Sequence, residues 1–387
     1  MKRVLFRAPV LTHSGYGVHA RQILRYLKGL EESGRISLQV QVLPWGDTPW
    51  MIDSSEKTRL IEYAMQRTGE LVAPYDVTIQ LQLPNEWDSR LGFKNIGVTA
   101  GVETDICNSE WVSACDKMDT VIVPSEHTRK CIMSSGAGEA LICVVPESYT
   151  DFDCVPTTSI LQSVKTEFNF LIHGQLTGMN DVTDRKNIFN TIRWICDVFR
   201  SDPSVGIVLK TNVARGTKID RKVTTSVIMK LLSEVRRGDH PRVHLVHGIL
   251  SDDENNSLYT DSRVKALVSL TRGEGFGLPL LEAAVAGLPI IATGWSAHTE
   301  FLGESFTRIN HRLIDVHQSK IDNNIFIKGS KWADTSEIDF KSKILKFRKD
   351  QSSEISAAKE LSKRLRVSHS FISISSKYNE VIGDFLL

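Results

Sequence analysis

Short apolar runs that alternate with helical patterns constrain the fold of this 387-residue chain most strongly. Each run is short enough for a buried strand, and strands that alternate with helices predict parallel sheets. A polar connector, 146–163, separates an earlier series of runs from a later one. The runs span residues 4–6, 38–43, 77–81, 96–98 and 120–123, and then 168–173, 206–210, 243–246, 266–270 and 289–293. We therefore predict an α/β fold of two Rossmann-like domains, residues 1–163 and 164–370, that face a central cleft. A last helix is predicted over 371–387.

The composition excludes several classes of protein. Lys and Arg number 47 against 46 Asp and Glu, which gives no overall attraction to nucleic acid or membrane. Up to Lys165 there are 16 basic and 20 acidic residues, against 31 and 26 in the rest, so the second part suits an anionic ligand. No stretch approaches the roughly 20 apolar residues of a membrane span. The six cysteines lack metal-ligand spacing, so we expect reduced thiols and a cytoplasmic location.

A glycine loop and a helix start lie between two glutamates, Glu274 and Glu282. The glycines allow the backbone to approach a ligand closely, and Pro279 suits the first helical position. Free N–H groups and the positive end of the helix then meet at one point, which is an anion site. Glu282 can accept hydrogen bonds from two neighbouring hydroxyls, and a phosphate beside a vicinal diol indicates a nucleotide ribose. The residues of the loop are Gly275, Phe276, Gly277 and Leu278.

A basic pair, Arg185 and Lys186, follows the predicted strand 168–173 and a glycine turn. At the start of a helix, two cations are well placed to bind a diphosphate. A solvated basic pair is the alternative interpretation of the same pattern.

The Glu-x7-Glu spacing, set in Glu-Gly-Phe-Gly-Leu-Pro, resembles the donor-site signature of the retaining glycosyltransferases of family four. The likeness covers nearly the whole chain, and a phage-encoded member is one candidate. It implies GT-B architecture, a last helix that crosses back to the first domain, and a nucleotide-diphosphate sugar as donor. It also implies that Glu274 faces the sugar, that Glu282 holds the ribose, and that Arg185 and Lys186 hold the diphosphate.

The first domain carries further similarities and one departure. Gly15 and Gly17 look like the glycine loop of this family, which lies under the reacting centre. Many members have a histidine that contacts the sugar where this chain has residues 99–103, without a histidine. Glu103 and Asp105 are the candidates to replace it, and capping of the next helix is their alternative role.

The last expectations concern metal binding, the acceptor and the alternative functions. Asp151 and Asp153 form an Asp-x-Asp, but within the connector rather than at the end of a strand, so we expect no metal and no cofactor. The acceptor stays open between a glycan, a lipid-linked or small molecule, and a hydroxymethylated DNA base. Two other functions are compatible with parts of the pattern: a retaining glycoside hydrolase, which needs carboxyl groups about 5–5.5 Å apart, and a non-catalytic protein that binds nucleotide sugars.

Overall fold

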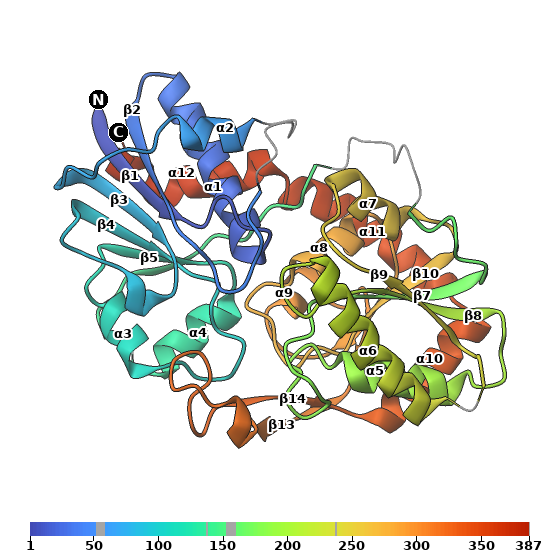
Figure 1. Cartoon of the computed structure of the whole chain (residues 1–387). Helices are drawn as coiled ribbons and strands as arrows, with labels where there is room; N and C mark the ends of the chain where they lie inside the picture. Colours follow the sequence, from blue (N-terminus) through green and yellow to red (C-terminus); the bar gives the residue numbers. More distant parts are fainter. Residues whose placement is uncertain (52–58, 137, 152–159, 237, 387) are drawn as a thin grey trace. The chain divides into compact units, whose positions relative to one another are not determined.

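The computed structural model describes residues 1–51, 59–136, 138–151, 160–236 and 238–386. The chain forms two compact units (Figure 1). The first unit comprises Met1–Ser148, Asp322–Ser330 and Ser368–Leu387, and the second comprises Tyr149–Ile321 and Lys331–Val367. Each unit contains one six-stranded parallel sheet, so the predicted α/β fold of two Rossmann-like domains is confirmed.

The sheet of the first unit has the strand order β2-β1-β3-β4-β5-β6. Its strands are β1 (Lys2–Ala8), β2 (Ile36–Val42), β3 (Tyr75–Leu81), β4 (Gly92–Val98), β5 (Thr120–Val123) and β6 (Ile142–Val144). Side chains alternate between the two faces, as β5 illustrates: Ile122 joins one apolar cluster, while Val121 and Val123 join the other. The first cluster includes helices α1 (Gly15–Glu32), α2 (Leu60–Met65) and α12 (Phe371–Leu386); the second includes α3 (Ser109–Cys115) and α4 (Glu126–Ser134).

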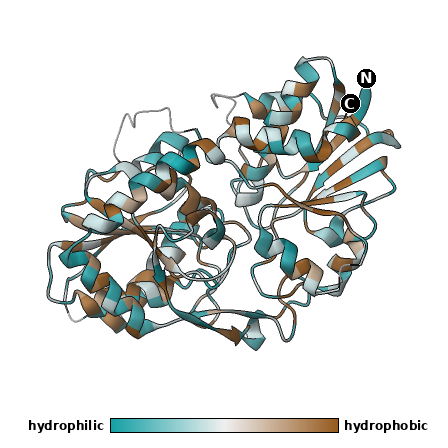
Figure 2. Ribbon diagram, turned by 180° about the vertical axis from the view of Figure 1, so that it is seen from behind, coloured by the Kyte–Doolittle hydropathy of each residue, from teal (hydrophilic) through white to brown (hydrophobic). Residues whose placement is uncertain are grey.

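The sheet of the second unit has the order β12-β11-β10-β7-β8-β9, which is the strand order of Rossmann folds. Its strands are β7 (Phe168–His173), β8 (Val205–Lys210), β9 (Arg242–Val246), β10 (Val264–Ser269), β11 (Ile290–Thr293) and β12 (Thr307–Ile309). Apolar residues gather on these central strands (Figure 2). One face packs on α5 (Ile188–Val198), α6 (Lys218–Val235) and α10 (Glu337–Lys349). The other packs on α7 (Asp252–Thr260), α8 (Leu278–Val285), α9 (His298–Leu302) and α11 (Ser352–Ser368).

The compact units divide at other points than the predicted boundary between residues 163 and 164. The first division lies between Ser148 and Tyr149, because Leu161 and Val164 are buried in the apolar cluster of the second unit. The segment Asp322–Ser330 also belongs to the first unit, although both of its neighbours in the chain belong to the second. It follows β13 (His311–Asp315) and the short helix η2 (Gln318–Lys320) and precedes β14 (Lys331–Thr335), and β13 and β14 form an antiparallel ribbon.

Helix α12 belongs to the first unit, in agreement with the prediction that the last helix crosses back to the first domain. Its apolar side chains Ile374, Ile382 and Leu386 are buried in the cluster that contains β1 and α1. A polar contact anchors the same helix, because the Tyr378 hydroxyl lies 2.8 Å from Nε2 of His19 on α1. Burial lowers the pKa of His19 to about 3, so this ring is neutral and the contact is an uncharged hydrogen bond.

Candidate functional site

The candidate donor site lies where the strand order of the second sheet reverses. β7 pairs with β8 on one side and with β10 on the other, so the chain leaves these two central strands in opposite directions across the sheet. The loops after β7 and β10 therefore lie next to each other at the carboxyl edge. Ligands of open α/β sheets bind at such a switch point. The loop after β7 carries Arg185 and Lys186, and the loop after β10 carries Glu274.

Glu274 brings the predicted cations together. Its Oε1 lies 2.5 Å from Nζ of Lys186, and its Oε2 lies 3.6 Å from the Arg185 guanidinium. Arg185 also donates to the Gly273 carbonyl at 2.7 Å, which joins the two loops directly. The three side chains are largely buried, with 9% of Glu274, 10% of Arg185 and 18% of Lys186 exposed. The sequence prediction placed these residues at one site, and within this unit they are in contact.

The protonation state of Glu274 follows from these partners. Burial alone would raise its pKa, but the charges of Lys186 and Arg185 outweigh this effect and hold the pKa at about 2. Glu274 is therefore ionised at neutral pH. One carboxylate against two cations gives these three side chains a net charge of +1, which favours an anionic ligand.

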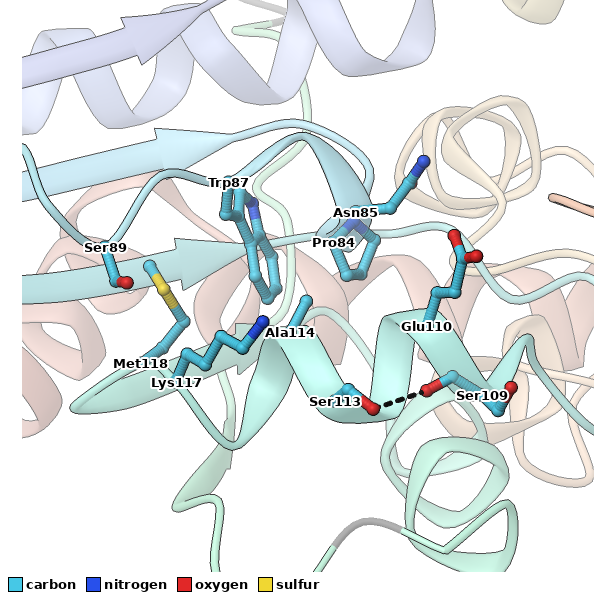
Figure 3. A pocket seen from close by; sticks show the side chains of 10 residues that line it. All are labelled: Pro84, Asn85, Trp87, Ser89, Ser109, Glu110, Ser113, Ala114, Lys117 and Met118. Atoms are coloured by element: carbon cyan, nitrogen blue, oxygen red, sulfur yellow. Dashed lines mark hydrogen bonds between the residues drawn. The ribbon is translucent and has the colours of Figure 1, made fainter.

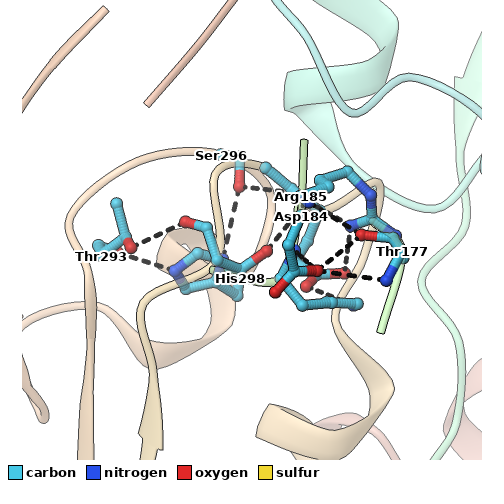
Figure 4. A network of polar contacts seen from close by, with 10 residues as sticks. Thr177, Asp184, Arg185, Thr293, Ser296 and His298 are labelled. Atoms are coloured by element: carbon cyan, nitrogen blue, oxygen red, sulfur yellow. Dashed lines mark hydrogen bonds and ion pairs between the residues drawn. The ribbon is translucent and has the colours of Figure 1, made fainter. Parts of the chain in front are cut away.

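Asp184, which the sequence prediction did not include, fixes the loop that carries the basic pair. Its carboxylate accepts hydrogen bonds from the backbone N–H groups of Thr177, Lys186 and Ile188, and from the Thr177 hydroxyl, at 2.7–3.2 Å. The Thr177 hydroxyl in turn accepts from the backbone N–H of Arg185 at 2.8 Å. Figure 4 shows this network, in which the buried Asp184 side chain contacts Thr177 near the start of the loop and Lys186 and Ile188 at its end. The sequence signal that could have indicated this role of Asp184 is the position of an acidic residue directly before a basic pair at a helix start.

The loop between the two glutamates requires a glycine directly before α8. Gly277 precedes α8 with φ +104°, a conformation that favours glycine, and a Cβ there would lie 3.2 Å from the Cβ of His298. Leu278 occupies the first helical position and Pro279 the second, one residue later than predicted. Gly275 and Phe276 are buried. The positive end of α8 thus begins directly after Gly277.

A second polar network supports this loop from the segment after β11. The hydroxyl of Ser296 accepts a hydrogen bond from the Glu274 backbone N–H at 3.0 Å and lies 3.4 Å from Nδ1 of His298. Nε2 of His298 donates to the Thr293 carbonyl at 2.7 Å (Figure 4). Ser296 itself has φ +79°, a strained conformation for a residue with a side chain. The backbone of Glu274 is therefore held by Ser296, while its side chain pairs with Arg185 and Lys186.

Glu282 lies in α8 and has partners of its own. Its Oε2 accepts from Nδ2 of Asn255 at 3.0 Å and from the Tyr259 hydroxyl at 3.1 Å, and its Oε1 accepts from the Thr150 hydroxyl at 3.1 Å. Burial raises its pKa, although these donors act in the opposite direction. A carboxylate has about four acceptor positions, so three protein donors leave room for a further one. Asn255 and Tyr259, four residues apart on α7, are site residues that the sequence prediction did not name.

In the first unit, the predicted glycine loop contacts the predicted acceptor loop. Ser14 caps α1 by accepting from the Gly17 N–H, and a Cβ on Gly17 would lie 2.0 Å from the Thr12 carbonyl oxygen, so glycine is required there. At Gly15 a Cβ would meet no atom within 4 Å. The hydroxyl of Tyr16, between these glycines, lies 2.9 Å from the Thr99 hydroxyl and accepts from the Ala100 N–H at 3.1 Å.

Glu103 and Asp105 lie half-buried in the loop between β4 and α3. Neither is the N-cap of α3, because Asn108 holds that position and accepts from the Glu110 N–H. The alternative of helix capping is therefore wrong for both. Burial, with Glu103 among the lesser causes, raises the pKa of Tyr16, so Glu103 lies close to the glycine loop. A role in acceptor binding stays a prediction.

A groove of about 350 Å³ runs along α3 in the first unit. Figure 3 shows Trp87 and Pro84 on one side and helix residues such as Ser113 and Lys117 on the other. Three atoms of the Trp87 ring lie 2.7 Å from the position of a Cβ on Gly97, so a glycine is needed beneath this ring. The groove contains none of the residues that the sequence analysis proposed for the acceptor.

Within the described residues, no group of three or more His, Cys, Asp or Glu side chains is arranged to hold a metal ion. Asp153 lies outside those residues, so the structure does not describe the Asp-x-Asp. In the same part of the chain, no helix combines the length and the apolar character that crossing a membrane requires.

Comparisons with known proteins agree with this architecture. Residues 239–320 match the family model for glycosyl transferases group 1. Anabaena HepE, solved in complex with UDP and glucose, is 11% identical with a TM-score of 0.67, over 99% of this chain and 100% of that one. A glycosyltransferase from Rickettsia africae is 13% identical with a TM-score of 0.66, over 100% and 98% of the two chains. Sucrose-phosphate synthase from Thermosynechococcus elongatus is 14% identical with a TM-score of 0.62, over 99% of both.

No curated protein sequence matches the chain significantly. The matched segment 239–320 contains both glutamates, the loop between them, and α7 with its two Glu282 partners. The chain therefore has the GT-B fold of glycosyltransferases, and the segment of its second unit that contains both glutamates matches the model for glycosyl transferases group 1.

Proposed function

We propose that this protein is a retaining glycosyltransferase that transfers a sugar from a nucleotide-diphosphate donor to a hydroxyl acceptor without a metal ion. The observation that carries the proposal is the cluster of Arg185, Lys186 and Glu274 at the switch point of the second sheet. Such a cluster suits a reaction whose leaving group is a diphosphate.

The leaving group gains negative charge as the bond to the sugar breaks. Lys186, Arg185 and the N–H groups at the start of α8 supply positive charge that is already in place. Glu274 holds both cations in the free protein, so a diphosphate that binds here shares them with a carboxylate. Glu274 thus sets the position of the cations and limits their net charge, besides facing the sugar.

Glu282 is proposed to hold the ribose hydroxyls of the donor. Its Oε1 accepts one hydrogen bond from Thr150 and its Oε2 accepts two, which leaves acceptor capacity on Oε1. The similar Anabaena HepE was solved in complex with UDP and glucose, and on that basis UDP-glucose is the first donor to test. The resemblance to family four supports attack on the same face as the leaving group, where the donor phosphate itself takes the acceptor proton.

The acceptor is proposed to bind to the first unit, near Tyr16, Glu103 and Asp105. Glycans, lipid-linked and small molecules are the main candidates. A hydroxymethylated DNA base is the second candidate, and the acidic balance of the first 165 residues, 16 basic against 20 acidic, counts against it.

The rival functions make different demands on the site. A glycoside hydrolase acts on a neutral substrate and has no use for two buried cations. A binding protein without catalysis would use the cations but would give neither transfer nor hydrolysis of the donor.

A donor screen followed by product analysis tests the proposal. Thermal shift with a panel of nucleotide sugars identifies the donor, and acceptor trials then use that donor. Proton NMR of the product should show the anomeric configuration of the donor. An inverted product would refute the retaining mechanism, and tight donor binding without any turnover would favour the binding protein.

A further inference from the structure

A hydrogen-bonded chain runs from Glu282 through Tyr259 to His173 in the second unit. The Tyr259 hydroxyl lies 3.1 Å from Oε2 of Glu282 and 2.8 Å from Nδ1 of His173. The rings of Tyr259 and His173 stack with their centroids 5.9 Å apart. Tyr259 is almost completely buried, whereas His173, the last residue of β7, is partly exposed. The chain therefore leads from the proposed ribose residue to the carboxyl edge of the sheet.

The direction of these hydrogen bonds follows from the number of protons available. The Tyr259 hydroxyl donates its single proton to Oε2 of Glu282, since a carboxylate oxygen accepts. The Tyr259 oxygen then accepts, and Nδ1 of His173 must carry the proton that it accepts. In a neutral imidazole, a protonated Nδ1 leaves Nε2 as a bare acceptor.

The surroundings of His173 keep the ring neutral. Burial, followed by the nearby charges of Lys210 and Lys186, lowers its pKa to about 3. Nε2 of His173 has no hydrogen-bond partner within the described residues, and it is not one of their buried atoms that lack a partner. This nitrogen is consequently open to a ligand, in a region where two lysines attract phosphate.

We propose that His173 is a donor-binding residue whose Nε2 accepts a hydrogen bond from a ribose hydroxyl of the nucleotide, and that Tyr259 is the positioning residue that fixes this tautomer. The proposal rests on the proposed function, because it assigns a further contact to the same ribose. A bare nitrogen acceptor suits a hydroxyl and repels a phosphate oxygen, which also only accepts. The shared partner Tyr259 places this acceptor one side chain away from Glu282, so the two residues suit neighbouring hydroxyls of one ligand.

The tautomer can be measured in the free protein. With histidine labelled by ¹⁵N, and with the His173→Gln spectrum to assign the signals, Nδ1 of His173 should be protonated and Nε2 bare. Tyr259→Phe removes the acceptor, so the proton should redistribute toward Nε2. The control Tyr26→Phe removes a buried hydroxyl of the first unit that has no partner among the described residues, and it should leave the His173 signals unchanged. A protonated Nε2 in the unmodified protein would overturn the proposal.

Ligand binding separates this inference from the proposed function. Saturating UDP should shift the Nε2 resonance of His173, and 2′,3′-dideoxy-UDP at saturation should not. In donor kinetics, His173→Leu should raise the Michaelis constant about tenfold with a smaller change in turnover, the size expected for one lost hydrogen bond to a buried group. His173→Gln should restore part of the loss, and the exposed His317→Gln should have no effect.

Two outcomes would count against different claims. If UDP saturates the protein while Nε2 does not respond, the assignment of His173 fails and the proposed function stands. If no nucleoside diphosphate binds at all, both the proposed function and the ribose contact fail.

Discussion

At the scale of single residues, we propose that the ion pair between Lys186 and Glu274 determines how much positive charge a donor meets. The pair is buried and short, and Arg185 adds a second cation to the same carboxylate. A diphosphate must therefore compete with Glu274 for both cations, and its advantage grows as negative charge develops on the leaving group.

Lys186→Ala should lower turnover about 100-fold, because removal of one preorganised donor typically costs about 3 kcal/mol of barrier. The same variant should bind UDP more weakly and UMP nearly as well as before. Release of nucleoside diphosphate measures turnover, and calorimetry measures the two affinities. Lys222→Ala, on the exposed side of α6, is the matched control. Wild-type turnover in the Lys186 variant would remove this lysine from the mechanism.

Glu274→Gln should destabilise the protein by about 3 kcal/mol, since it leaves two buried cations without their counter-charge. The pKa of Glu274 in the folded protein, about 2, lies below its ordinary value of 4.5. Its contribution to stability is therefore complete above pH 4.5 and is lost as the pH falls from 4.5 toward 2. Urea unfolding between pH 7 and pH 3 should show this loss in the wild type and a smaller one in the variant. Parallel curves for the two proteins would contradict the predicted pair.

Glu282→Gln should raise the donor Michaelis constant roughly tenfold or more and lower turnover less, because ribose binding serves ground and transition states alike. Steady-state kinetics with the best donor gives both constants. Glu234→Gln, exposed on α6, controls for the loss of a charge. An unchanged Michaelis constant in a folded Glu282 variant would refute the ribose role.

At the scale of elements, the sequence predicted the buried strands and the helices whose apolar residues recur at regular spacing. The strands β5 and β7 have the predicted bounds, and Gly277 and Gly287 both adopt positive φ next to α8. The elements that were not predicted from the sequence form through pairing with residues distant in the chain. β6 is a three-residue edge strand that is only half-buried, no residue of β13 is fully buried, and burial in β14 does not alternate along the strand.

The candidate site shows the same division. Glycines, a basic pair and spaced glutamates are local signals, and they located the loops after β7 and β10. Asp184 contacts residues only two to seven positions away, and its place directly before the basic pair was a local signal. Tyr259 and His173 act through contacts with residues 23 and 86 positions away, which no local pattern reveals. The mutual pairing of Lys186 and Glu274, 88 positions apart, was likewise not predictable.

Helix α12 should contribute to the stability of the first unit through its buried face. Ile382 is completely buried, and Ile382→Ala should lower the free energy of unfolding by about 2–4 kcal/mol. Ile372, 80% exposed on the same helix, provides the control, and its substitution by alanine should change stability by less than about 0.5 kcal/mol. Urea denaturation followed by circular dichroism measures both. Equal effects of the two substitutions would show that α12 is not packed as described.

At the scale of the whole molecule, the proposed chemistry relies on charges that the chain itself supplies. Transfer should therefore continue at its normal rate in EDTA, because Arg185, Lys186 and the start of α8 neutralise the diphosphate. The measurement compares initial rates with and without chelator. A loss in EDTA that manganese or magnesium restores would return attention to Asp151 and Asp153.

Each unit is built from separate stretches of the chain, and this limits how recombination between related genes can exchange one unit for another. The backbone passes from one unit to the other after Ser148, Ile321, Ser330 and Val367, so neither unit is an uninterrupted stretch. A single recombination joint between two related genes would combine strands from one parent with α12 or the segment 322–330 from the other. An exchange of the complete second unit, for example to import the sugar preference proposed to lie there, requires four joints. Point changes in the loops after β7 and β10 are the simpler route to a new donor.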